Sequence, residues 1–117
     1  MIELPNKKYK IIYVDPPWPI GLFSKTVRPL QKKFPYKQMS LEEIKKMPIK
    51  KIVDKTGCHL FLWTTQTYLP FAFKVIEAWG FKYHCCITWN KCGGWCCNGF
   101  YRQTEFCLFG YKGKLLQ

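Results

Sequence analysis

The chain has 117 residues, of which 48% are hydrophobic and 18% aromatic, and its formal net charge is +12. This length and composition fit one small domain with a packed core and exclude a wholly disordered chain. The apolar runs are too short to cross a bilayer and the N-terminus lacks a secretory signal, so we expect a soluble cytoplasmic protein with no membrane partner. The basic excess favours a polyanionic partner such as nucleic acid, although a lysine-rich solvated surface is the plainer alternative.

The first predicted strand, Tyr9–Val14, leads into the tetrapeptide Asp15-Pro16-Pro17-Trp18. An amine conjugated to a purine or pyrimidine ring is a weak nucleophile, because its lone pair is delocalised into the ring. The Asp15 carboxylate and a Pro16 carbonyl outside any sheet ladder could each accept one amine hydrogen and so free that lone pair. The prolines stiffen the turn, and an exposed Trp18 indole could stack a base lifted from its helix.

On these four residues alone, an ordinary proline turn with Trp18 in the core explains the motif equally well. Residues 19–37 follow, with three prolines, five Lys/Arg and no sustained period, and predict a long mobile basic loop. Ser40 and Glu43 then form a capping box that predicts a short helix ending at Pro48.

The second half of the chain alternates strand and helix patterns. It predicts a buried strand at Leu60–Trp63, a helix at Tyr68–Trp79 ended by Gly80, and strands at Tyr83–Trp89 and Glu105–Tyr111. The Gly- and Cys-rich segment 90–104 is predicted to be a second mobile loop. Trp63, Trp79 and Trp89 are expected in the core.

The chain has seven cysteines, an odd number that includes two adjacent pairs. Such a set is a poor disulfide framework and fits a reducing compartment. A zinc site is one interpretation, but paired Cys-x-x-Cys spacing is absent, so buried or incidental thiols are favoured and no metal is assigned. The residues that raise this question are His84, Cys85, Cys86, Cys92, Cys96 and Cys97.

Alternating strands and helices favour an α/β fold with a mostly parallel sheet, helices on its faces and right-handed crossovers. No helix separates the last two strands, so they are expected to pair as an antiparallel hairpin. Ligands of such sheets lie beyond the carboxyl ends of the strands. Asp15, Thr64 and Asn90 fall at predicted ends and should share one cleft.

Several further segments resemble one family in order and spacing. They are Pro35-Tyr36, Met39–Ile44, Leu60–Thr65, Trp79–Phe81, Ile87–Lys91, Gly94-Trp95 and Glu105–Gly110. Together with Asp15-Pro16-Pro17-Trp18, these segments are similar to the MT-A70 family of adenine-N6 methyltransferases, which use S-adenosylmethionine. The resemblance covers nearly the whole chain from Tyr9 and implies a Rossmann-like methyltransferase sheet.

By this resemblance, Asp15, Pro16, Pro17 and Trp18 would be catalytic, and Asp15 would also contact the cofactor. Substrate contacts are implied at Tyr36, Thr64, Asn90, Lys91 and Arg102. Tyr101 departs from the family, which commonly has a basic residue at that place, while Arg102 lies one position nearer Glu105. A G-x-G turn and an acid for the cofactor's ribose are also absent from the sequence.

The sequence therefore predicts residues 1–117 to be a single, apparently truncated methyltransferase domain that holds the substrate-side half of the sheet. The expected activity is methyl transfer from S-adenosylmethionine to adenine N6 in nucleic acid, with DNA favoured over RNA by analogy. A homo- or hetero-oligomer, or a downstream polypeptide, would complete the cofactor site. Two alternatives are a non-catalytic nucleic-acid-binding or scaffold subunit and a small zinc module.

Overall fold

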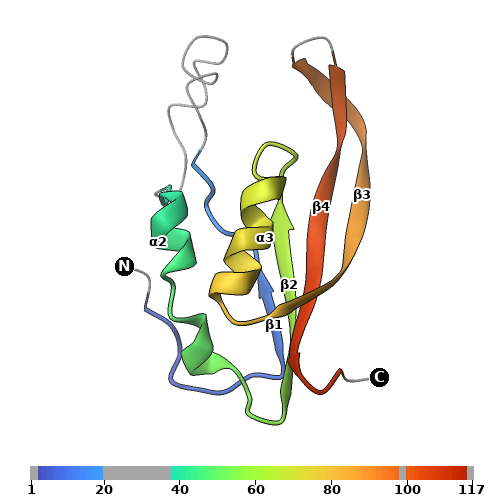
Figure 1. Ribbon diagram of the computed structural model, residues 1–117. Coiled ribbons are helices and arrows are strands. Elements are labelled where there is room, and N and C mark those ends of the chain that lie inside the picture. The colour runs from blue at the N-terminus through green and yellow to red at the C-terminus, as the bar shows by residue number, and fades with distance from the viewer. Residues whose placement is uncertain (1–2, 20–37, 98–99, 116–117) are drawn as a thin grey trace.

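A four-stranded sheet with helices on one side forms the framework of the computed structural model, which describes residues 3–19, 38–97 and 100–115 (Figure 1). The elements in chain order are β1 (Ile11–Val14), α2 (Leu41–Lys45), the 3-10 helix η2 (Ile49–Ile52), β2 (Gly57–Thr64), α3 (Leu69–Ala78), β3 (Lys82–Cys97) and β4 (Phe100–Gly113). No helix among these described residues is long and apolar enough to cross a membrane.

The strands lie in the order β1-β2-β4-β3. β1 pairs with β2 in parallel, whereas β4 pairs antiparallel with both β2 and β3. β1, β2 and β3 therefore run in one direction, and β4 runs against them from a place between β2 and β3. The α/β class and the terminal antiparallel hairpin are confirmed. The expected mostly parallel pairing is only partly right, because β1–β2 is the single parallel pair of named strands in the described sheet.

Both predicted helices form, and local signals set their ends. The Ser40 hydroxyl accepts a hydrogen bond from the Glu43 backbone N–H, and the Glu43 carboxylate accepts one from the Ser40 N–H, each at 3.1 Å. This capping box satisfies free amides at the start of α2. Beyond the end of α3, Gly80 has a φ of 85°, a left-handed conformation that glycine adopts without steric cost.

The prediction of a loop at 90–104 is wrong. Strand β3 continues to Cys97 and β4 begins at Phe100, with Asn90 opposite Thr104 and Trp95 opposite Arg102. The hydrogen bonds between these strands override the turn signals of the glycines, because they satisfy the backbone groups of both strands. The register shifts between Asn90 and Trp95. Of the other predicted loop, residues 20–37 lie outside the described residues.

The core lies between the helices and one face of the sheet. Alternate residues of β2, beginning with Cys58, are buried on that face, as the period of two in a strand requires. Ala72, Val75 and Ile76 of α3 cover them and are fully buried. Trp79 is 1% exposed and its indole N–H donates to the Ile44 carbonyl at 3.0 Å, which ties α3 to α2. The core position predicted for Trp79 is confirmed.

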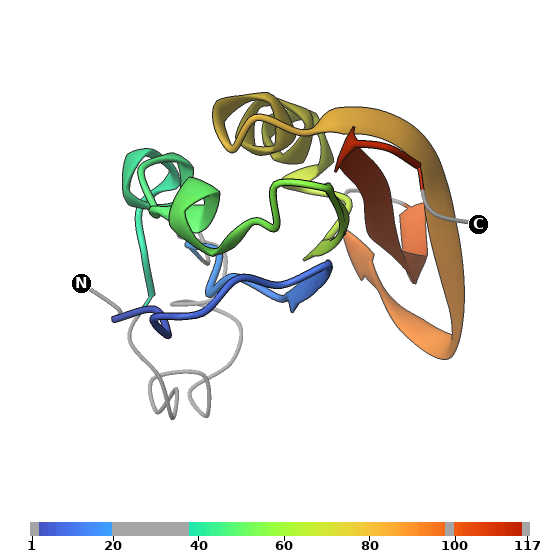
Figure 2. The same cartoon turned by 90° about the horizontal axis from the view of Figure 1, so that it is seen from below.

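The other face of the sheet is uncovered by any described element. Viewed end-on, α2 and α3 lie on the same side of the sheet (Figure 2). On the opposite face, Tyr13 is 67% and Trp89 50% exposed. The core position predicted for Trp89 is therefore wrong, because an alternating strand at the sheet's edge turns that residue away from the helices.

Candidate active site at the end of strand β1

The Asp15-Pro16-Pro17-Trp18 turn lies immediately after β1, at the carboxyl end of the parallel strand pair. The Trp18 backbone N–H donates to the Pro16 carbonyl at 2.8 Å, and the Met39 N–H donates to the Pro17 carbonyl at 3.0 Å. The Pro16 carbonyl thus lies outside any sheet ladder, as predicted, although one of its two lone pairs is already used. The other lone pair can accept a further hydrogen.

Trp18 is buried, at 7% exposure, so the prediction of an exposed indole is wrong. Its ring is stacked on Tyr68, with centroids 5.6 Å apart and planes 9° from parallel. Its indole N–H donates to the carbonyl of Trp63 at 3.0 Å. Because both the ring face and the donor have partners within the chain, Trp18 anchors the turn to β2.

Tyr68 is a second anchor that the sequence did not reveal. It occupies the cap position before α3, and its hydroxyl donates to the carbonyl of Pro19, just past the turn. One side chain therefore stacks on the turn and also bonds to its exit. No local pattern signals this role, since the two partners lie 49 residues apart in the chain.

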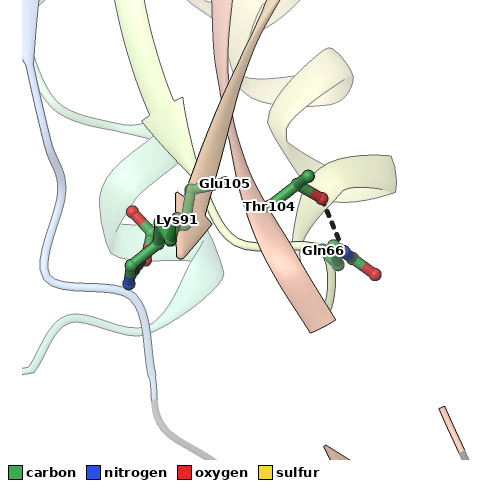
Figure 3. A network of polar contacts seen from close by, with 4 residues as sticks. All are labelled: Gln66, Lys91, Thr104 and Glu105. Atoms are coloured by element: carbon green, nitrogen blue, oxygen red, sulfur yellow. Dashed lines mark hydrogen bonds and ion pairs between the residues drawn. The ribbon is translucent and has the colours of Figure 1, made fainter. Parts of the chain in front are cut away.

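The Asp15 carboxylate has a perturbed electrostatic environment. Partial desolvation, and then the negative charge of Glu105, raise its pKa above the ordinary value. Glu105 lies on β4 and forms an ion pair with Lys91 of β3, with 3.0 Å between Oε1 and Nζ (Figure 3). The carboxylate whose charge acts on Asp15 is thus itself paired with an ammonium group.

Glu105 is a site residue to which the sequence alone assigned no role. It stands in β4 directly before the hydrophobic run Phe106–Phe109, and an acid next to such a run is a signal that could have been followed. Thr104 points to the other side of the sheet, where its hydroxyl accepts a hydrogen bond from the Gln66 side-chain amide at 2.8 Å (Figure 3).

The structure places the predicted substrate contacts in different parts of the sheet. Lys91 is paired with Glu105, whose charge acts on Asp15. Thr64 ends β2 as predicted but is 3% exposed, and its hydroxyl donates to the Thr65 carbonyl at 3.0 Å. Asn90 lies inside β3, so its predicted place at a strand end is wrong, because the strand continues past it.

Arg102 connects the β3–β4 hairpin to the segment after β2. Its guanidinium donates to the Thr67 hydroxyl at 2.8 Å. This contact gives Arg102 a structural role, and one hydrogen bond leaves most of the guanidinium donors available for a phosphate. The predicted contact at Tyr36 lies outside the described residues.

The described thiols differ sharply in environment. Cys58 and Cys107 are buried, whereas Cys85 and Cys92 are exposed. Burial, with a smaller contribution from Cys86 and Asp15, raises the pKa of Cys107 to about 11. In residues 3–19, 38–97 and 100–115 there is no group of three or more His, Cys, Asp or Glu side chains that could hold a metal ion.

Comparison with known proteins places these features in one family. The MT-A70 family model matches residues 9–116. A curated protein, Type II methyltransferase M.MunI of Mycoplasma sp, is 30% identical over 129 aligned residues, which cover 97% of this chain and 55% of the relative. The chain thus spans little more than half the length of this relative. Because the family match runs from before β1 through the Asp15 turn to the end of β4, the chain belongs to the MT-A70 family of methyltransferases.

Proposed function

We propose that this chain provides the substrate side of a methyltransferase that moves a methyl group from S-adenosylmethionine to N6 of adenine in nucleic acid. The observation that carries this proposal is Asp15 at the end of β1, directly before Pro16, whose carbonyl lies outside the sheet ladder. The net charge of +12 favours a polyanionic substrate. DNA is favoured over RNA by analogy.

The proposed chemistry begins with two acceptors for one amine. The Asp15 carboxylate accepts one N–H of the adenine amino group and the Pro16 carbonyl accepts the other. The turn holds both acceptors in place, since Trp18 is stacked and hydrogen-bonded and the prolines restrict φ. Preorganised acceptors of this kind need no reorganisation when charge develops on the nitrogen.

The amine nitrogen becomes positive as its lone pair forms the new bond. Asp15 stabilises that charge directly, and the raised pKa of its carboxyl makes it the better acceptor of the released proton. Glu105 adds a second negative charge nearby, while Lys91 holds the Glu105 carboxylate in position. Positioning and electrostatics would thus supply most of the catalysis.

The described residues fit the reacting end of S-adenosylmethionine. Asp15 and Glu105 would favour a positively charged sulfonium near the turn, and the cofactor would supply an electrophilic methyl group. The sequence has no G-x-G turn, so the rest of the cofactor-binding site would come from another polypeptide segment. A cytoplasmic location is part of this proposal.

A second candidate function is a non-catalytic subunit that binds nucleic acid. The observation that favours it is the sequence itself, which contains no G-x-G turn for a cofactor. The raised pKa of Asp15 counts against it, since an acceptor and a nearby carboxylate at a strand end are features of a working site.

Methyl transfer and cofactor binding separate the two candidates. The chain is incubated with S-adenosylmethionine and either DNA or RNA, alone and together with the part of M.MunI outside the matched segment. Digestion and mass spectrometry then detect N6-methyladenine, and calorimetric titration measures cofactor binding. We expect Asp15→Asn to lower methylation at least about 100-fold, and Glu42→Gln, a change at an exposed acid on α2, to leave it unchanged. Nucleic-acid binding without methylation in either mixture would support the non-catalytic subunit.

A further inference from the structure

Lysine side chains gather at one end of the sheet. At this end β1, β2 and β3 begin, and β4, which runs against them, finishes (Figure 1). The exposed lysines that form this surface, which we call the amino-end surface, are Lys10, Lys50, Lys55, Lys82, Lys112 and Lys114. The Asp15 turn follows the last residue of β1 and so lies at the opposite end, where α/β sheets bind their ligands. The candidate active site therefore does not account for the amino-end surface.

The fold brings these lysines together from five separate segments. Lys10 directly precedes β1, Lys55 lies in the turn before β2, and Lys82 is the first residue of β3. Lys112 lies opposite Cys58 near the start of β2, because β4 runs back to this end of the sheet. No run of basic residues in the sequence marks the surface, since strand pairing alone makes it continuous.

Some of these side chains lie very close to one another. A Cβ placed on Gly80 would be 3.2 Å from Cε of Lys50 and 3.6 Å from Nζ of Lys112, so both lysines reach the same point beyond the end of α3. A Cβ placed on Gly57 would be 3.5 Å from the backbone nitrogen of Lys114, which puts that residue beside the start of β2. Like charges at such separations repel each other, and a bound anion relieves the repulsion.

Acidic side chains neutralise little of this charge. The ion pairs within the described residues are Lys45–Glu42 and Lys91–Glu105. Neither pair includes a lysine of the amino-end surface. The elements at this end carry two acids, Asp54 before β2 and Glu77 in the last turn of α3. The Asp54 carboxylate already accepts hydrogen bonds from the backbone N–H and the hydroxyl of Thr56. The surface therefore keeps a strong positive balance.

The arrangement of the lysines fits a polyanion of extended shape. Neighbouring strands lie about 4.8 Å apart, so the surface is about 14 Å wide from β1 to β3. Phosphates of one strand follow each other at about 3.4 Å along a duplex axis, so this width matches roughly four of them. Proteins that lie on a membrane surface carry their lysines on an amphipathic helix, whereas the helix at this end, η2, has only four residues.

We propose that the amino-end surface binds the sugar-phosphate backbone of nucleic acid, outside the segment that holds the target base. The choice of nucleic acid rests on the proposed function, but the binding itself needs neither adenine nor cofactor. It is independent of base sequence and weakens steeply with salt, because each lysine displaces counterions from the phosphates. The eight residues of β2 separate the surface from the Asp15 end by about 25 Å. The surface thus holds the protein on its substrate at a second place.

A probe without adenine tests the proposal. The complete chain is titrated into a fluorescent single-stranded oligothymidylate of about 20 nucleotides, and anisotropy gives the affinity at several salt concentrations. Lys50→Gln with Lys112→Gln removes the two charges beside Gly80, and Lys55→Gln with Lys114→Gln removes two beside the start of β2. At about 0.1 M salt each pair is expected to weaken binding at least tenfold. The dependence of the logarithm of affinity on the logarithm of salt concentration should become shallower by about 1.4.

A matched pair of substitutions controls for net charge. Lys45→Gln with Lys74→Gln removes the same charge from the helices α2 and α3, and it is expected to change the affinity by less than about twofold. Lys50→Arg with Lys112→Arg keeps the charge at the surface and is expected to bind as the unchanged chain does. Circular dichroism and thermal melting confirm that every variant folds.

Three outcomes would overturn the proposal. The oligothymidylate does not bind, both surface pairs bind it as well as the unchanged chain, or the control pair weakens binding as much as they do. Binding to phosphatidylserine vesicles without binding to the oligothymidylate would give the surface to a membrane instead. The probe contains no adenine and the titration no cofactor, so a failure of methyl transfer leaves this result unaffected. Methyl transfer that persists while the surface pairs bind normally would keep the proposed function and remove this second site.

Discussion

The indole nitrogen of Trp18 lies 3.0 Å from the main-chain carbonyl oxygen of Trp63, to which it donates a hydrogen bond. This bond joins the turn after β1 to the carboxyl end of β2, the neighbouring parallel strand. Tyr68 packs on the other side, against the face of the Trp18 ring. The position of Asp15 therefore depends on an indole that was expected to contact substrate.

Replacing each of the two indoles separates their contributions. Trp18→Phe loses the hydrogen bond to the Trp63 carbonyl, whereas the Trp63 indole N–H is buried with no hydrogen-bond partner in the described structure. We expect Trp18→Phe to lower the free energy of unfolding by about 1 kcal/mol more than Trp63→Phe. Urea denaturation followed by circular dichroism measures the difference, and equal losses would contradict the anchoring role of Trp18.

The hydroxyl of Tyr68 can be removed without its ring. Tyr68→Phe keeps the stack on Trp18 but loses the bond to the Pro19 carbonyl, which we expect to cost about 1 kcal/mol of stability. Tyr68→Ala loses both and is expected to cost about 3 kcal/mol or more. In an assay of methyl transfer, Tyr68→Phe should lower kcat with little change in KM, because the turn loses orientation. An increase in KM with kcat unchanged would instead assign Tyr68 to substrate binding.

The raised pKa of Asp15 makes a signed prediction about stability and pH. A carboxyl whose folded-state pKa exceeds its unfolded value stabilises the fold below the unfolded pKa, and this contribution is lost as pH rises through the folded pKa. Asp15→Asn should therefore raise the melting temperature at pH 7, and the gain should vanish near pH 3. Methyl transfer should show the opposite trend, falling as the Asp15 carboxylate is protonated. Thermal melts across this range check the sign.

Thiol reactivity should follow burial. At pH 7.5 iodoacetamide should modify Cys85 and Cys92, which are exposed, well before Cys107, whose pKa is raised to about 11. Mass spectrometry of peptides gives the order. The same reaction in guanidinium chloride is the control, where all thiols should react at similar rates. Early labelling of Cys107 in the native protein would contradict its burial in the sheet.

Gly110 is predicted to tolerate no side chain, because a Cβ there would lie 2.9 Å from the Lys82 carbonyl oxygen of the neighbouring strand. The backbone of β3 cannot move away without breaking its ladder with β4. We expect Gly110→Ala to lower the free energy of unfolding by about 1–3 kcal/mol. Urea denaturation provides the measurement, and an unchanged midpoint would show that β3 can shift.

Features set by near neighbours in the chain could be predicted from the sequence. Ser40 and Glu43 are three residues apart and cap α2 as expected, and Gly80 ends α3. The position of β4 between β2 and β3 could not be predicted, because strand pairing joins residues that are far apart in the chain. Asn90 illustrates the difference: its local sequence favours a loop, whereas its pairing with Thr104 makes it part of a strand.

The candidate site divides in the same way. The Asp15 motif was recognised because its residues are consecutive and its chemistry is specific. The burial of Trp18 was one of two alternatives that the sequence left open, since its partners are Trp63 on another strand and Tyr68 at the cap of a helix. Glu105 acts on Asp15 only through the folded sheet. Residues that come together only in the folded protein have no recognisable spacing in the sequence.

The place of β4 in the sheet has a consequence for synthesis on the ribosome. β2 and β3 share no edge, and each makes its ladder with β4, which is translated after both of them. Until that strand has emerged, β3 has no partner and β2 has an open edge, so the nascent chain exposes unpaired strands that can aggregate. Pairing of β2 must then wait for insertion of β4, a long-range step that makes folding slow. Growth at lower temperature, which slows aggregation, should therefore increase the yield of soluble protein.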